Sequence, residues 1–150
     1  MIYLGADHRG YYLKEAIKKY LEAQKIPYED VGNLKYDEND DYPDFASLVA
    51  QKLQKNLEEN RGILLCGTGI GMSIVANKYQ GIRAGLCLSG FMAQKAREDD
   101  DINVLCLAAD ITDEATAIRI VKTFLETKFK KDVRYERRIK KITKIEKTLK

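Results

Sequence analysis

The strongest constraint on the fold of this chain is a regular alternation of short apolar runs with stretches of helical periodicity. A strand, a helix and a second parallel strand form a right-handed crossover, so this alternation predicts a parallel sheet covered on both faces. We therefore expect a Rossmann-like three-layer α/β sandwich with a five-stranded sheet. The five expected strands are Ile2–Ala6, Pro27–Val31, Gly62–Cys66, Ile82–Cys87 and Asn103–Ala108.

Helical segments are expected between and after these strands. The first follows Gly10, and the one near residue 113 has Thr112 or Asp113 as a candidate N-cap. The remaining segments are Phe45–Leu53, Ile70–Asn77, Phe91–Arg97 and a basic C-terminal helix at 128–150.

The length of 150 residues predicts a single domain, 1–150, with a sizeable core. The longest apolar runs, such as Gly62–Cys66, are far shorter than the roughly 20 residues of a membrane-spanning helix. Charged residues follow the first apolar run at once, unlike the pattern of a signal peptide. These features predict a cytoplasmic protein without a membrane partner.

The chain has three cysteines and one histidine. Three cysteines cannot all pair within one chain, and they lie in apolar segments, so a disulfide framework is not expected. Their spacing does not match that of metal ligands, and one histidine provides little material for a zinc site. We therefore expect no metal site.

Positive charge is concentrated at the C-terminus. The segment 128–150 has eleven Lys and Arg against three acidic residues, so it carries +8 while the rest of the chain carries −5. Such a segment could bind nucleic acid non-specifically. Apolar residues recur in it at roughly helical spacing, and no aromatic stacking or helix-turn-helix pattern is present. We favour an amphipathic helix that packs on protein, with apolar positions Val133, Ile139, Ile142, Ile145 and Leu149.

Polar residues follow the first expected strand at the sheet edge where ligands of such folds bind. Asp7, His8 and Arg9 place an acid, an imidazole and a guanidinium there. A carboxylate beside an imidazole favours its protonated form, which suits an anion contact. A polar turn with a helix cap is the alternative interpretation.

A glycine-rich turn follows the third expected strand, at Cys66–Ser73. Backbone N–H groups in such a turn, together with a helix N-terminus, can bind an anion. The glycines match neither a dinucleotide fingerprint nor a P-loop. Cys66 begins the turn, where backbone donors would favour a thiolate that acts as base or nucleophile. The alternative is a small buried apolar residue, as we assume for Cys87 and Cys106, and pairing of Cys66 with His8 stays open.

Taken together, these segments resemble the ribose-5-phosphate isomerase type B family, which includes the galactose-6-phosphate isomerase subunits. The resemblance covers nearly the whole chain. Its most specific part is Cys66–Gly71 followed by Ala76-Asn77-Lys78. It also includes Gly5-Ala6-Asp7-His8, Asp41-Tyr42-Pro43-Asp44, Gly81-Ile82-Arg83-Ala84, Asn103-Val104-Leu105, Arg134 and Arg138.

The resemblance implies interconversion of an aldose phosphate and a ketose phosphate through a cis-enediolate, without metal or coenzyme. It implies that Cys66 is the base, that Asp7 relays protons at the sugar hydroxyls and that Thr68 assists ring opening. It implies a homodimer or homotetramer with active sites shared between subunits, in which the C-terminal helix packs on a neighbour. The binding residues implied are Gly67, Gly69, Ile70 and Gly71 for the enediolate, His8, Arg134 and Arg138 for the phosphate, and Asn103 for the sugar.

This chain departs from the family pattern at the stretch that precedes Asn103. Asp99 stands where ribose-type members carry a ring-opening His, and Asp100 stands where they carry a sugar-binding Asn. Asp110 occupies a position often held by a phosphate-binding Arg, and Tyr135 replaces a common His.

Two accounts of these departures compete. In the first, which we favour, Asp99 or water opens the ring and ribose 5-phosphate stays the substrate. In the second, the substrate is another sugar phosphate: a tetrose 4-phosphate, or an allose or galactose 6-phosphate. Four consecutive acids beside an anionic substrate are unfavourable unless they face solvent or pair with Arg97. A catalytically impaired sugar-phosphate-binding homologue and a nucleic-acid-associated protein are the rival function classes.

Overall fold

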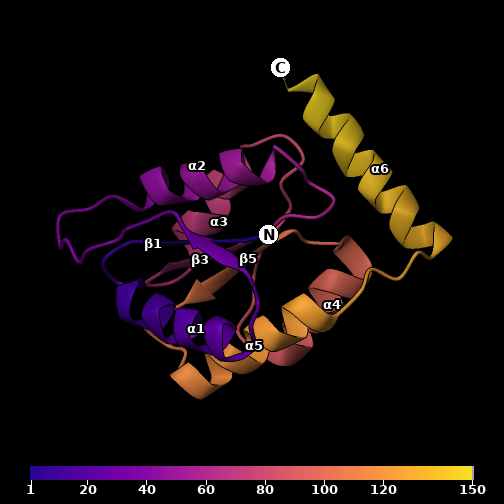
Figure 1. The fold of residues 1–150 in the computed structure, drawn as a ribbon. Coiled ribbons are helices and arrows are strands. Elements are labelled where there is room, and N and C mark those ends of the chain that lie inside the picture. Colours follow the sequence, from indigo (N-terminus) through magenta and orange to yellow (C-terminus); the bar gives the residue numbers. More distant parts are fainter. Residues whose placement is uncertain (150) are drawn as a thin grey trace.

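The computed structural model describes residues 1–149 and contains a five-stranded, fully parallel sheet (Figure 1). The strands are ordered β2-β1-β3-β5-β4, so the strand order reverses direction between β1 and β3. The strands are β1 (Ile2–Ala6), β2 (Tyr28–Asp30), β3 (Arg61–Cys66), β4 (Ala84–Leu86) and β5 (Val104–Ala108). The expected fold class is confirmed, although β4 is shorter than its apolar run suggested.

Helices cover both faces of the sheet. In Figure 1, α2 and α3 lie above the strands, and α1, α4 and α5 lie below them. Asp113, not Thr112, caps α5, because its side chain accepts a hydrogen bond from the Thr116 N–H. The helices are α1 (Tyr11–Ala23), α2 (Tyr42–Leu53), α3 (Ile70–Ala76), α4 (Gly90–Asp100), α5 (Glu114–Glu126) and α6 (Val133–Thr148).

The core consists of two apolar layers separated by the sheet. Successive side chains of a strand point to opposite faces, so β3 contributes to both layers. Ile63 and Leu65 pack with residues of α1 and α5, whereas Leu64 and Cys66 pack with residues of α2 and α3. This burial on both faces explains why β3 and β5 are continuous apolar runs rather than alternating ones.

The turn between β1 and α1 lies directly against the end of β3. A Cβ atom added to Gly10 would come 2.6 Å from the carbonyl oxygen of Leu65, so this close approach requires glycine. The Asp7 N–H also donates to the Leu65 carbonyl, at 3.2 Å. These contacts bring the residues that follow β1 next to the glycine-rich turn that follows β3.

The C-terminal helix α6 projects away from the sandwich (Figure 1). It begins at Val133, later than the predicted 128–150, because residues 128–132 form an extended connection whose Asp132 caps the helix. None of its residues is buried. The contacts that hold α6 and its connection to the body include hydrogen bonds from the Lys130 N–H to the Glu98 carbonyl and from the Gly81 N–H to Glu146 Oε1. The Lys130 ammonium also forms an ion pair with the Glu98 carboxylate. No helix within residues 1–149 is long and apolar enough to cross a membrane.

Candidate active site

The carboxyl ends of β1, β3 and β5 meet at one edge of the sheet. Ala6 is paired with Leu65, and Cys66 is paired with Ala108. The segments that continue from these strands therefore lie side by side. They contain Asp7, His8 and Arg9 after β1, the glycine-rich turn after β3, and Asp110 after β5.

Cys66 lies at the last position of β3, with its thiol turned into the glycine-rich turn. The residue is 5% exposed, and its Sγ accepts a hydrogen bond from the Gly69 N–H at 3.1 Å. Gly69 has a φ of 72°, a left-handed conformation that glycine adopts without strain, and it leads directly into α3. This geometry brings a backbone donor onto the sulfur.

Two backbone N–H groups of the same turn, those of Gly67 and Gly71, have no acceptor within residues 1–149. Thr68 is exposed beside them, and its hydroxyl accepts a long hydrogen bond of 3.4 Å from the Ile70 N–H. Free N–H groups at a helix start can bind an anionic oxygen. The turn thus places the Cys66 sulfur and unpaired backbone donors side by side.

The other two cysteines differ from Cys66 in their surroundings. Burial raises the pKa of Cys87 to about 11, and it raises the pKa of the fully buried Cys106 further still. Both thiols therefore stay protonated near neutral pH. Their interpretation as small buried apolar residues agrees with this environment.

Asp7 accepts backbone hydrogen bonds within the β1–α1 turn, and its pKa is raised. Its Oδ1 accepts hydrogen bonds from the Arg9 and Gly10 N–H groups, both at 3.0 Å. Burial raises the pKa of Asp7 above the usual aspartate value, and the charge of Asp40 adds to this rise, against the opposing effects of the Gly10 N–H and His8. A raised pKa suits a carboxyl group that gives and takes protons.

The acid in contact with His8 is Asp40, from the loop before α2, and not the adjacent Asp7. Asp40 Oδ1 accepts from the His8 N–H at 2.9 Å and lies 2.7 Å from His8 Nδ1. No hydrogen bond joins His8 to Cys66 among the residues that the structure describes. Activation of the thiol by direct pairing with this histidine therefore has no support in the geometry.

Sequence reasoning placed Arg9 at this edge, but it did not assign Asp40, Tyr42 or Asp110 to the site. The guanidinium of Arg9 lies over Gly67 and forms an ion pair with Asp110. The ring of Tyr42 lies against Gly71, since a Cβ atom added there would come 2.7 Å from the ring. Asp110 was noted only as a departure, and no local pattern in the sequence indicates its pairing with Arg9, 101 residues away.

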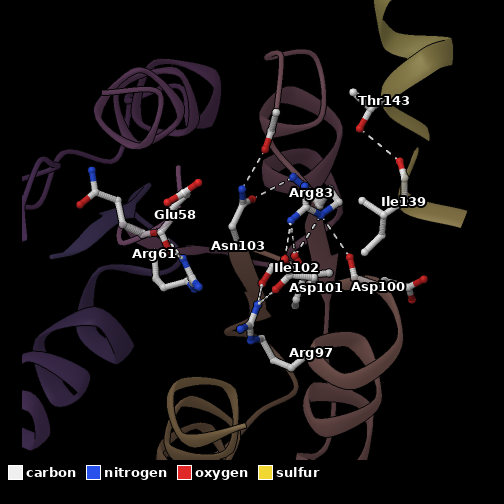
Figure 2. Close-up of polar contacts among 12 residues, drawn as sticks. Glu58, Arg61, Arg83, Arg97, Asp100, Asp101, Ile102, Asn103, Ile139 and Thr143 are labelled. Carbon is white, nitrogen blue, oxygen red and sulfur yellow. Dashed lines mark hydrogen bonds and ion pairs between the residues drawn. The ribbon is translucent and has the colours of Figure 1, made fainter. Parts of the chain in front are cut away.

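The acidic stretch Glu98–Asp101 lies at the opposite edge of the sheet, because α4 runs antiparallel to the strands and ends at the beginning of β5. Two of its four acids, Glu98 and Asp101, form ion pairs, and Figure 2 shows those of Asp101. Asp101 pairs with Arg83 at 2.9 Å and with Arg97 at 2.6 Å, and Glu98 pairs with two lysines. The expected pairing with Arg97 is thus present. Asp100 is exposed, and Asp99 has a buried Oδ1 without a partner within residues 1–149.

Asn103 has a different role from the sugar contact that the resemblance implied. It is 2% exposed, its Oδ1 accepts from the Arg83 N–H, and its Nδ2 donates to the Gly81 carbonyl, both at 2.8 Å (Figure 2). Both polar atoms therefore hold the connection between α3 and β4 in place. Each polar atom of the Asn103 side chain is thus engaged within the chain.

Arg134 and Arg138 lie on the exposed helix α6, away from the Cys66 turn. Neither guanidinium has an ion-pair partner within residues 1–149. One chain therefore brings together Asp7, His8, Thr68 and the Cys66 turn, but not Asp99, Asp100, Arg134 or Arg138.

Asp7, His8 and Asp40 also lie close enough to share a cation, with donor atoms within 4.8 Å of one another. The nearest pair of these atoms, His8 Nδ1 and Asp40 Oδ1, is already joined by a hydrogen bond. An acidic cluster of this kind is common without a bound ion. The geometry favours mutual hydrogen bonding over metal ligation.

The chain is similar in sequence to known proteins. The family model described as Ribose/Galactose Isomerase matches residues 2–142. A probable ribose-5-phosphate isomerase B of Mycoplasma genitalium is 43% identical over 146 residues, which cover 97% of this chain and 95% of that protein. A D-erythrulose-4-phosphate isomerase of Pectobacterium atrosepticum is 40% identical over 128 residues, 85% of this chain and 84% of that protein.

Solved structures show the same fold at similar identity. The crystal structure of ribose-5-phosphate isomerase B from Mycoplasma genitalium with bound ribulose-5-phosphate matches with a TM-score of 0.94 and 43% identity, and covers 97% of this chain and 95% of that one. The Thermotoga maritima ribose 5-phosphate isomerase matches with a TM-score of 0.90 and 47% identity, and covers 95% of this chain and 97% of that one. The chain belongs to the ribose/galactose isomerase family, and is an aldose–ketose isomerase by fold and sequence.

Proposed function

We propose that this protein interconverts ribose 5-phosphate and ribulose 5-phosphate through a cis-enediolate, with Cys66 as the base. The observation that carries this proposal is the Gly69 N–H on the Cys66 sulfur beside two unpaired N–H groups. The relatives named as ribose-5-phosphate isomerases support the choice of substrate.

The proposed chemistry requires only groups of the chain itself. Cys66 removes the proton from C2 of the open-chain aldose and returns it to C1. The Gly67 and Gly71 N–H groups bind the enediolate oxygens, because donors fixed in advance stabilise developing negative charge. We assign Gly69 to the thiolate instead, since its N–H already contacts the sulfur. The Ile70 N–H is engaged with Thr68, so its contact with the enediolate requires that long bond to break.

Asp7 and His8 have separate proposed roles. Asp7, whose pKa is raised chiefly by burial, moves protons between the sugar hydroxyls. His8 binds the phosphate. Thr68, exposed at the mouth of the turn, assists ring opening.

We further propose that a second copy of this chain completes each site. In one chain, α6 exposes an apolar surface, and it carries Arg134 and Arg138, which have no ion-pair partner within residues 1–149. Forked guanidinium donors suit phosphate oxygens. A partner that covers this surface would bring Arg134 and Arg138 to the phosphate end of the site, and would bring its Asp99 and Asp100 to the sugar. The exposed apolar residues are Val133, Ile142, Ile145 and Leu149.

Proton NMR in D₂O tests the chemistry. With ribose 5-phosphate as substrate, the wild-type protein should form ribulose 5-phosphate with deuterium at C1, and the reverse reaction should place deuterium at C2 of the ribose 5-phosphate. Cys66→Ala should lose both, whereas Cys87→Ala, the matched cysteine control, should retain both. Equal activity in Cys66→Ala and the wild type would exclude Cys66 as the base.

Mixing two inactive variants tests the sharing of sites. Cys66→Ala and Arg138→Ala should each be nearly inactive alone. After subunit exchange, half of the dimers combine one chain of each kind, and one of their two sites has both residues intact. About a quarter of wild-type activity should then return. No recovery after demonstrated exchange would mean that both residues act within one chain.

A four-carbon sugar phosphate is the second candidate substrate. The carboxylate of Asp99, with a buried oxygen that has no partner within residues 1–149, favours it because a tetrose phosphate has no ring to open. The relative from Pectobacterium acts on such a compound by name. In the same NMR assay, turnover of erythrose 4-phosphate without turnover of ribose 5-phosphate would select this substrate. Binding of either compound without turnover would indicate a binding protein.

A further inference from the structure

The loop before α2 places a carboxylate behind the only histidine of the chain. We propose that Asp40 is a positioning residue that holds the His8 ring in one orientation and one tautomer, so that Nε2 is the atom offered to the substrate phosphate. This inference rests on the proposed function, in which His8 binds that phosphate.

Asp40 contacts both the backbone and the ring of His8. Its Oδ1 accepts from the His8 backbone N–H at 2.9 Å and lies 2.7 Å from the ring Nδ1. An ionised carboxylate can only accept, so Nδ1 carries the hydrogen in this bond. The partner of one ring nitrogen sets the state of the other, and Nε2 has no partner within residues 1–149. The Asp40 side chain is 8% exposed, and that of His8 is 28% exposed.

The carboxylate is itself held by a chain of contacts that begins in the sheet. Asn33 Nδ2 donates to Asp40 Oδ2. The Asn33 N–H donates to the Ala6 carbonyl at 2.8 Å, and the Asn33 carbonyl accepts from Lys14 Nζ at 2.5 Å. Lys14 is fully buried. Supported in this way, Asp40 is a rigid acceptor, and rigid support is what keeps a binding side chain in productive geometry.

The charges around the pair limit what Asp40 can do. Asp7 and Arg9 lie on the same turn as His8, and Lys14 faces Asn33 from α1. A carboxylate near a phosphate would repel it if it were free. His8 donates to one Asp40 oxygen and Asn33 donates to the other, and these hydrogen bonds partly compensate the charge of the carboxylate. Asp40 therefore acts through His8 rather than on the substrate.

Nitrogen NMR observes this pair without any substrate. The chain has a single histidine, so labelling with ¹⁵N-histidine gives one pair of ring signals. At alkaline pH, the wild type should show the signals of a fixed Nδ1–H tautomer. Asp40→Ala should give averaged signals of two tautomers. Asp40→Asn, which keeps an acceptor oxygen, should fall between them.

Kinetics give the second readout. Asp40→Ala should raise the KM for ribose 5-phosphate about tenfold, because a charge-assisted contact to the phosphate loses its alignment, while kcat changes much less. Asp40→Asn should recover part of this loss. Glu38→Gln, which removes a charge from an exposed residue of the same loop, should leave KM unchanged.

The outcomes separate the inference from the function on which it rests. An unaltered tautomer in Asp40→Ala, or an altered tautomer with unaltered KM, would overturn the positioning role. If His8→Ala itself leaves KM unchanged, the phosphate role of His8 fails instead. Thermal unfolding of each variant verifies that it is folded at the temperature of the NMR and kinetic measurements.

Discussion

Substitution of the buried lysine of α1 tests how far the site depends on the body of the fold. Lys14 is fully buried, and its Nζ donates to Asp30 at 2.7 and 2.8 Å and to the Asn33 carbonyl at 2.5 Å. Lys14→Met retains the apolar stem and removes the ammonium. Asp30 then loses one of its two lysine partners, and the Asn33 carbonyl loses a donor.

The magnitude follows from what remains around Asp30. Removal of one partner from a buried ion pair typically costs about 3–5 kcal/mol. Lys18, at 3.0 Å, and the Gly32 N–H, at 3.1 Å, still compensate the Asp30 charge. We therefore expect the lower end, about 3 kcal/mol, which corresponds to a fall in Tm of about 10 °C for a chain of this size. Urea unfolding monitored by circular dichroism measures this free energy directly.

Lys18→Met is the matched control, because Lys18 contacts the same carboxylate from a partly exposed position. It should cost only about 0.5 kcal/mol, as exposed ion pairs do. The double variant Lys14→Met/Asp30→Asn should be less destabilised than the sum of its single variants, because the unpaired buried charge is gone. A cost below about 1 kcal/mol for Lys14→Met would refute the reasoning.

Two further predictions concern other parts of the fold. Hydrogen bonds from Lys95 and then Lys130 lower the pKa of Glu98 to about 2, so its carboxylate stabilises the fold above the ordinary glutamate pKa and this contribution is lost as pH falls toward 2. Glu98→Gln should therefore reduce the loss of Tm between about pH 5 and about pH 3. An equal loss of Tm in both proteins would contradict this prediction. Gly10→Ala should lower the free energy of unfolding by about 1–3 kcal/mol in urea, because the added Cβ meets the Leu65 carbonyl. Gly90→Ala is the control and should be nearly neutral, because its Cβ meets only the Thr123 hydroxyl at 3.3 Å. Similar costs for the two substitutions would disprove the close-approach argument.

Sequence periodicity predicted the sheet because each strand is a local signal. The run Gly62–Cys66 is apolar throughout, since β3 is buried on both faces, and the glycines after it mark the turn. The end of a parallel strand is also where ligands bind, so Cys66 could be found as a candidate. The same local reasoning overextended the last helix, because basic residues before Asp132 continue the composition of α6 without its structure.

Contacts between distant segments lay outside this reasoning. Asp40 meets His8 across 32 residues, and Asp110 meets Arg9 across 101 residues, and no periodicity specifies such a pairing. Asn103 was assigned by resemblance to the sugar, but its side chain holds the connection before β4. An amide in a loop matches a ligand contact and a loop brace equally well in sequence. Only the positions of Gly81 and Arg83 distinguish them.

The proposed division of the site between two chains has its basis in the parallel arrangement of the strands. Each helix returns the chain from the carboxyl edge of the sheet to the amino edge, so any residue at the end of α4 lies far from the end of β3. Asp99 and Asp100 therefore cannot belong to the same local site as Cys66 in one copy. Residues at opposite edges can act together only if a second copy presents its amino edge to the first. The exposed apolar face of α6 is the surface suited to hold that copy in place under this proposal, and the segment before α6 is hydrogen-bonded to α4 through the Lys130 N–H.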